Sequence, residues 1–165
     1  MAGAALSTAE AIHVAHAMCV HAHYYSNDQM RAEDLVHFMI GTASAWGGLP
    51  DKAAVYENIQ PNLPVGKYEL TVKDVPVSGF WSISLYNEKG YFQKNSLNAY
   101  SLNNLTAKPN SDGSYTLRFG GCTASTENCL PIMKGWNYAV RMYEPGKAIV
   151  DGSWKFPGPP IPRAK

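Results

Sequence analysis

The spacing of hydrophobic residues changes along the chain, from a helical repeat to strand-like alternation after Pro64. The apolar residues that recur at helical spacing are Leu35, Phe38, Met39 and Ala43. They predict a helix over residues 30–46. Ser7 and Glu10 have the spacing of a capping box, in which two side chains satisfy free amides at a helix start. A first helix is therefore expected over residues 8–24.

The second part of the chain alternates with a period of two. Four stretches alternate or are rich in β-branched and aromatic residues, and they are 67–73, 79–86, 114–119 and 136–143. Shorter strands are expected at 91–93 and near Tyr100. A short helical turn is expected to open at Pro50 and to end near Tyr56. The proline-rich tail, residues 157–162, should be extended.

This order of elements predicts an α+β fold. Several antiparallel strands at short spacing favour a β-sandwich or rolled sheet, with the N-terminal helices packed on one side. The length of 165 residues suits one domain, so residues 1–165 are expected to form a single domain. It would comprise a helical region over 1–48 and a β-sandwich core over 64–158.

Strand alternation also predicts which side chains form the core. One face of the two longest strands is apolar, and its residues are Trp81, Ile83, Leu85, Trp136, Tyr138, Val140 and Met142. The opposite face carries Phe80, Ser82, Ser84, Tyr86, Asn137, Ala139, Arg141 and Tyr143. We expect the first set to be buried and the second set to form a separate, more polar face.

A candidate ligand site follows from that polar face. Small Ser82, Ser84 and Ala139 would leave space beneath Arg141, Tyr86 and Tyr143 if the two strands are neighbours. An arginine surrounded by tyrosine hydroxyls can bind a carboxylate or a phosphate. The more common role for such an arginine is structural, in an ion pair or in bonds to loop carbonyls. If Arg141 binds a ligand, it is expected to face a cavity.

Composition narrows the classes of partner. Charged residues make up 16 % of the chain and the net charge is +1. No basic cluster is present, which argues against nucleic acid as a partner. No run approaches the ~18 apolar residues of a membrane span. The weak charge and the ten tyrosines favour self-association, so we expect a homo-oligomer to which the helical region contributes.

A group of histidines offers a possible metal site. His13, His16, Cys19 and His23 fall within roughly 120° of one helix face. Side chains at this spacing can share a divalent metal. The same face also carries apolar residues, and packing against another surface is the preferred interpretation. No other cofactor is indicated.

The sequence shows no clear motif for nucleophilic catalysis. The chain has neither a GxSxG elbow nor an SxxK motif, and all five histidines precede residue 38. Of the three cysteines, Cys122 and Cys129 are near enough in sequence to close a small loop. Ordinary unpaired thiols are the preferred interpretation.

The β-rich part resembles a known family through several sequence blocks. They are GFWSISLYNEKGYF (79–92), NAYSL (98–102), SDGS (111–114), NCLP (128–131), RMYEP (141–145) and DGSW (151–154). In order and spacing they are similar to the domain of unknown function 1214, over roughly residues 40–158. Residues 46–50 and 54–56 are similar to the entry segment of that family. Where members commonly have Arg and Trp, this chain has Ala99 and Cys129.

The resemblance implies a β-sandwich of jelly-roll type and no established reaction. Members usually follow a second domain of unknown function, numbered 1254, in bacterial envelope or secreted proteins. That implies a periplasmic or secreted location, although the first ten residues lack the basic start and apolar core of a signal peptide. From the block at 98–102 we add Asn98 and Tyr100 to the ligand candidates.

Three functions are therefore open. The first is an oligomeric β-sandwich that binds a small molecule, such as a small anion, or serves assembly. The second is an enzyme, a hydrolase or lyase, that uses the pocket of Arg141 and the tyrosines. The third is metal binding through the His-rich helix.

Overall fold

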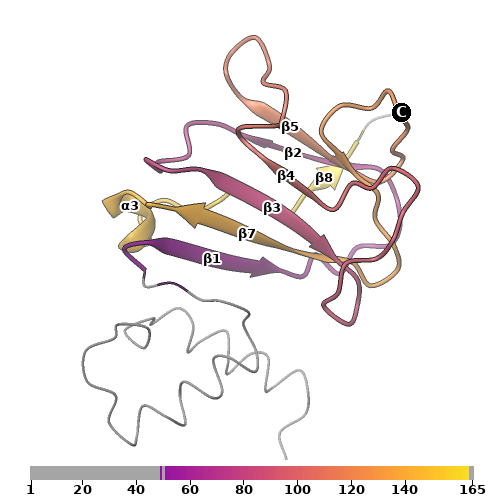
Figure 1. Cartoon of the computed structure of the whole chain (residues 1–165), viewed down its shortest axis with the longest axis horizontal. Helices are drawn as coiled ribbons and strands as arrows, with labels where there is room; N and C mark the ends of the chain where they lie inside the picture. Colours follow the sequence, from indigo (N-terminus) through magenta and orange to yellow (C-terminus); the bar gives the residue numbers. More distant parts are fainter. Residues whose placement is uncertain (1–48, 50, 164–165) are drawn as a thin grey trace, which may run out of the picture. The chain divides into compact units, whose positions relative to one another are not determined.

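The computed structural model describes residue 49 and residues 51–163 (Figure 1). The expected helices over 8–24 and 30–46 lie outside these residues, as does their packing on the sheet. The β structure belongs to a compact unit that begins at Tyr56. The expectation of a single domain over the whole chain stays a prediction.

Eight strands and one short helix, α3 (Lys147–Val150), occur among the described residues. The strands are β1 (Ala54–Ile59), β2 (Tyr68–Val72), β3 (Trp81–Tyr86), β4 (Ser101–Asn103), β5 (Tyr115–Phe119), β6 (Cys129–Leu130), β7 (Asn137–Tyr143) and β8 (Ile161–Pro162). Sheet A has the order β1-β7-β3-β4, and sheet B has the order β6-β5-β2-β8. β3 pairs antiparallel with β4 and β7, and β2 with β5 and β8, whereas β5 and β6 are parallel.

The four longer strands predicted from sequence are confirmed within a few residues, as β2, β3, β5 and β7. A turn opens after Pro50, as expected, and covers residues 51–53, but its expected extension to Tyr56 is wrong because this residue lies inside β1. Val55, Tyr56 and Ile59 favour a strand, and pairing beside β7 ends the turn early. The strand expected at 91–93 is absent, since Tyr91 and Phe92 lie in the connection between β3 and β4.

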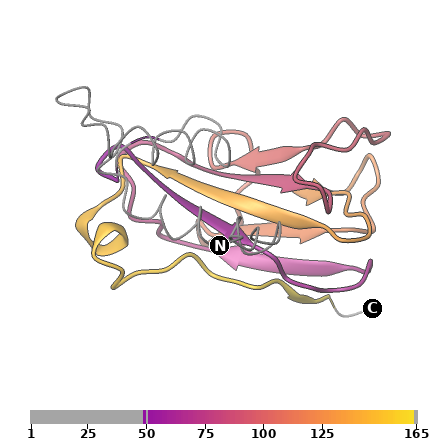
Figure 2. The ribbon, with the colours of Figure 1, turned by 90° about the horizontal axis from the view of Figure 1, so that it is seen from below.

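The proline-rich tail is extended, and its end joins sheet B. Ile161 pairs with Glu69 of β2, and Pro162 pairs with Tyr68. In Figure 2 the segment from α3 to β8, drawn in yellow, runs along the length of the β structure. The tail thereby covers part of an edge of sheet B that would otherwise present unpaired backbone groups.

The predicted core is confirmed. The register places Trp81 opposite Met142, Ile83 opposite Val140 and Leu85 opposite Tyr138. The predicted core residues are all buried, each with at most 3 % of its surface exposed. Sheet B supplies further buried side chains, and the rings of Phe119 and Tyr138 lie 5.3 Å apart across the two sheets. One core therefore holds both sheets together.

Cys122 and Cys129 form a disulfide, with their Cα atoms 5.6 Å apart. The preferred interpretation of these two residues as unpaired thiols is therefore wrong. The parallel pairing of β5 with β6 sets Cys129 beside Arg118, and the loop between the strands returns Cys122 to the same place. A short sequence spacing alone could not show this return. Cys19 lies outside the described residues.

Candidate functional site

The outer face of sheet A carries the site residues predicted on β3 and β7. The register sets Ser82 opposite Arg141, Ser84 opposite Ala139 and Tyr86 opposite Asn137. These side chains leave the sheet on the side away from the core, because neighbours along each strand alternate. The site is predicted only if β3 and β7 are neighbours, and they are neighbours in sheet A.

Arg141 is half-buried on this face and is held by two hydroxyl groups. Its Nη1 donates to Ser84 Oγ at 2.9 Å, and its Nη2 donates to Tyr86 OH at 2.8 Å. Ser84 is itself buried. Within the described part of the chain Arg141 forms no ion pair. Among the residues that the structure describes, the guanidinium is thus positioned by neutral groups, and neither a carboxylate nor a loop carbonyl bonds to it.

Aromatic side chains flank Arg141 on both sides. Phe80 stacks on Tyr143 with ring centroids 4.4 Å apart, and Tyr86 stacks on Phe92 at 4.9 Å. Phe92 is 54 % exposed and also meets the ring of Tyr100 at 5.7 Å. Sequence reasoning missed Phe92, because it lies in a connecting loop where alternation carries no information. Two adjacent aromatic residues directly after the turn at Gly90 were the available signal.

The remaining candidates have local partners. The Tyr100 hydroxyl donates to Asn98 Oδ1 at 3.3 Å, so both lie beside Phe92. Asn137 Nδ2 donates to the backbone oxygen of Asn87 at 2.8 Å, which ties the turn after β3 to β7. The structure therefore brings Arg141, Ser84 and Tyr86 into direct contact, whereas Asn137 is turned toward a loop.

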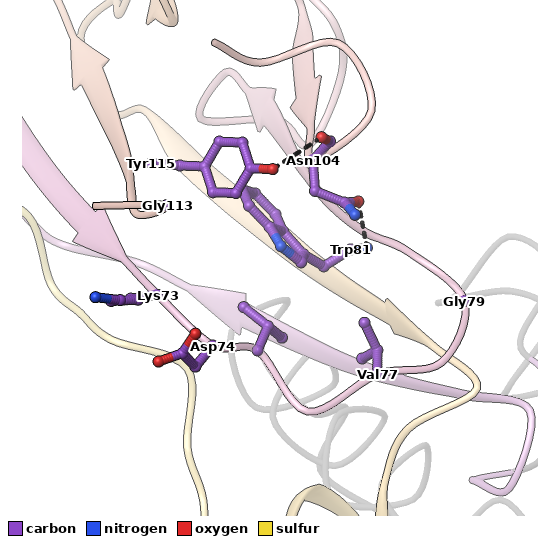
Figure 3. Close-up of a pocket in the computed structure, with 9 residues that line it drawn as sticks. Lys73, Asp74, Val77, Gly79, Trp81, Asn104, Gly113 and Tyr115 are labelled. Atoms are coloured by element: carbon purple, nitrogen blue, oxygen red, sulfur yellow. Dashed lines mark hydrogen bonds between the residues drawn. The ribbon is translucent and has the colours of Figure 1, made fainter. Parts of the chain in front are cut away.

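A hollow of about 230 Å³ lies elsewhere, between the connection from β2 to β3 and the start of β5 (Figure 3). Trp81, Asn104 and Tyr115 line it, together with Lys73 and Asp74. Loop residues form most of its wall, so the strand pattern did not predict it. A second hollow, of about 570 Å³, is lined by Asn137 among others. Arg141 lines neither, so the cavity expected beneath it is not one of these two.

Most polar groups around the first hollow already have partners. Asn104 Oδ1 accepts from the Trp81 backbone N–H at 3.0 Å, and the Tyr115 hydroxyl donates to the Asn104 backbone oxygen at 3.2 Å (Figure 3). At the rim, Lys73 and Asp112 form an ion pair at 3.5 Å. These bonds fasten two loops to each other, which is a structural role.

The metal site predicted from His13, His16, Cys19 and His23 lies outside the described residues. Within 51–163, no three His, Cys, Asp or Glu side chains are grouped so that they could hold a metal ion. The same part of the chain contains no helix that is long and apolar enough to cross a membrane.

Burial perturbs two acidic groups near the end of sheet A. Desolvation raises the pKa of Glu57 on β1, although a bond from the Phe156 N–H and the charge of Lys155 act in the opposite direction. Desolvation and the nearby Glu57 charge raise the pKa of Tyr138, whose hydroxyl is buried without a hydrogen-bond partner. Because Tyr138 points into the core and not toward Arg141, this pair lies apart from the candidate site.

Comparisons with known proteins agree with the resemblance in the sequence. The family model for proteins of unknown function named DUF1214 matches residues 58–147. Among solved structures, the VPA0106 protein from Vibrio parahaemolyticus is similar, with 28 % sequence identity and a TM-score of 0.61. That match covers 73 % of this chain and 33 % of the other, so the chain spans about a third of that protein's length. No curated protein matches the chain.

Proposed function

The chain belongs to the DUF1214 family, whose function is unknown, and we propose that it binds a small anionic ligand through Arg141 on the outer face of sheet A. The ligand group is a carboxylate, which the planar guanidinium can bind with two parallel hydrogen bonds.

The state of Arg141 is the observation that carries this proposal. A half-buried positive charge is costly unless an opposite charge or several acceptors compensate it. Its two hydrogen bonds go to neutral hydroxyls, and it forms no ion pair within the described part of the chain. A guanidinium has five N–H donors, so three are left to bind a ligand.

The alternative of an enzyme has less support at this site. A hydroxyl nucleophile needs a base that removes its proton. The Ser84 and Tyr86 hydroxyls both accept hydrogen bonds from Arg141, a cation that cannot act as a base. The histidines precede residue 38, so a hydrolase or lyase would need one of them beside Arg141. Metal binding by the N-terminal histidines stays a prediction.

Three further properties are proposed together with ligand binding. We propose that the two sheets form a jelly-roll β-sandwich, that the protein is a homo-oligomer, and that it is periplasmic or secreted. The Cys122–Cys129 disulfide supports that location, because disulfides persist mainly in oxidising compartments. Exposed Val65, Leu105 and Val150 support association.

Thermal shift and calorimetry with acetate, galacturonate, benzoate and phosphate test the proposed function. At a concentration a hundredfold above its Kd, a bound carboxylate should raise the Tm by roughly 5–10 °C. Arg141→Lys should weaken binding about tenfold, because it loses one of two charge-assisted hydrogen bonds. The unliganded variant should melt close to the parent.

Arg118→Lys is the matched control. Arg118 is also half-buried on a strand, but its Nη1 donates to the backbone oxygen of Glu127 at 3.0 Å. Its replacement should leave ligand binding unchanged. If Arg141→Lys lowers the Tm of the unliganded protein, and no carboxylate protects the parent, the role of Arg141 is structural and the proposal fails.

A further inference from the structure

The two stacked aromatic pairs and Arg141 form a row along sheet A. Tyr143 lies two residues beyond Arg141 on β7 and stacks on Phe80, whereas Tyr86 lies at the opposite end of β3 and stacks on Phe92. From residue 80 to residue 86 an extended strand spans roughly 20 Å. We call the row of Phe80, Tyr143, Arg141, Tyr86 and Phe92 the aromatic track.

Small side chains form the floor of the track. Ser82 lies opposite Arg141 in the register, and Ser84 lies opposite Ala139. Arg141 reaches across this floor to Ser84 and Tyr86, so the guanidinium lies between the two stacked pairs as the charged group of the track. This arrangement fits a ligand that lies along the strands better than one enclosed in a pocket.

The length of the track exceeds what one small molecule needs. A single carboxylate ligand would occupy Arg141 and its two hydroxyl partners, and it would leave the aromatic pairs unused. Phe92, at one end, is 54 % exposed. Exposed aromatic residues on a weakly charged surface mark binding sites.

We infer that the ligand is a linear acidic oligosaccharide that lies along the aromatic track, with a carboxylate on Arg141 and sugar rings on the aromatic pairs. This inference rests on the proposed function, because it uses the same arginine. Aromatic faces are electron-rich, so they attract the C–H face of a sugar ring. The hydroxyls of the sugar would find polar partners in Asn98 and Tyr100, which lie beside Phe92.

Charge and topology favour a sugar chain over other polymers. A nucleic acid would need several cations to neutralise its phosphates, and Arg141 is the only cation on the track. An extended peptide is usually bound by addition to a sheet edge, whereas the track lies on a sheet face. A sugar chain with one acidic unit among several rings matches one guanidinium between two aromatic pairs.

Calorimetry on the full chain tests the inference with three probes: galacturonate, an acidic hexamer in which one of the six sugar units is a uronate, and cellohexaose as a neutral hexamer. The acidic hexamer should bind at least tenfold more tightly than the monomer, because it also contacts the aromatic pairs. Phe92→Ala should weaken the hexamer by about tenfold, which is the size of one aromatic contact, and leave the monomer unchanged. Arg141→Lys should weaken both acidic probes.

Tyr91→Ala is the matched control, because Tyr91 is 63 % exposed and stacks on no ring among the described residues. It should bind the hexamer like the parent. Both variants remove exposed side chains, so each should melt close to the parent.

The outcomes separate the two proposals. If the monomer binds through Arg141 but the hexamer is no tighter, the track is overturned and the proposed function stands. If cellohexaose binds as tightly as the acidic hexamer, the acidic sugar is overturned as the ligand class. If none of the three probes binds, the track is overturned, and the proposed function fails as well if acetate, benzoate and phosphate also do not bind.

Discussion

Strand alternation places the outer faces of both sheets over the same core, yet the arginines on the two faces have different neighbours. On sheet B, Glu69 lies directly opposite Arg118, and Thr71 lies opposite Thr116 with their hydroxyl oxygens 3.5 Å apart. On sheet A, Arg141 lies opposite the neutral Ser82. Sheet B thus sets its arginine opposite an acidic residue, whereas β3 sets a neutral serine opposite Arg141.

The difference between the two arginines indicates where function lies. Arg118 bonds to the loop carbonyl of Glu127, which fastens the disulfide-closed loop to β5. Within the described part of the chain, Arg141 bonds to the hydroxyls of Ser84 and Tyr86, which orient it. A positioned charge without a partner is stabilising only when a ligand supplies that partner, whereas a satisfied charge stabilises the fold itself. We therefore propose that a ligand binds the outer face of sheet A, whereas the arginine on the outer face of sheet B stabilises the fold.

The substitution with the largest expected effect on stability, at Trp136, tests whether the two sheets share one core. Trp136 is 3 % exposed, and its ring lies 5.4 Å from Phe119 of β5 and 6.2 Å from Tyr138 of β7. Trp136→Ala should cost about 3–5 kcal/mol of unfolding free energy. Because both sheets lose contacts, amide exchange should speed up in β5 and β7 alike.

Ile161→Ala is the control for this change, since Ile161 is 64 % exposed. It should alter the unfolding free energy by less than about 0.5 kcal/mol. Exchange that accelerates in one sheet only would show that the faces have separate cores, and the comparison between them would then lose its basis.

The disulfide offers a change confined to sheet B. It closes a loop across a sequence separation of 7 residues, from which chain entropy predicts a loss of about 2.5 kcal/mol on removal. The double variant Cys122→Ala, Cys129→Ala should lower the Tm by the amount that corresponds to this loss of unfolding free energy. It should leave the affinity for the carboxylate unchanged. Cys19→Ala, which replaces a cysteine and leaves the Cys122–Cys129 disulfide intact, is the control. A loss of affinity in the double variant would mean that sheet B takes part in binding.

The sequence predicted the arrangement of sheet A better than it predicted the loops. Alternation alone gave the burial of Trp81 and the outward direction of Arg141, because strand geometry fixes both. The partners of Arg141 followed only from the register between β3 and β7, which depends on contacts distant in sequence. Phe92 and Cys122 lie in loops, where position is set by tertiary contacts that no local pattern records.

The smallest expected effects concern acidic groups on the two sides. Hydrogen bonds from Ser114, first from its hydroxyl and then from its N–H, hold the pKa of the exposed Asp112 below its usual range. Burial does the opposite for Glu57 on β1 of sheet A and raises its pKa. The partners of Asp112 therefore outweigh its desolvation, whereas burial of Glu57 outweighs the bond from the Phe156 N–H and the charge of Lys155.

These opposite shifts predict opposite dependences of stability on pH. A lowered folded pKa means that the unfolded chain binds more protons, so the contribution of Asp112 is present above its ordinary value of 3.8 and is lost as the pH falls. A raised folded pKa means that the folded chain binds more protons, so Glu57 costs stability as the pH rises above its ordinary value of 4.5. Relative to the parent, Glu57→Gln should therefore gain Tm between pH 4 and pH 7, whereas Asp112→Asn should lose Tm over the same range. Melting curves from pH 3 to pH 8 measure both, and shifts of the same sign would contradict the contrast between the two sides.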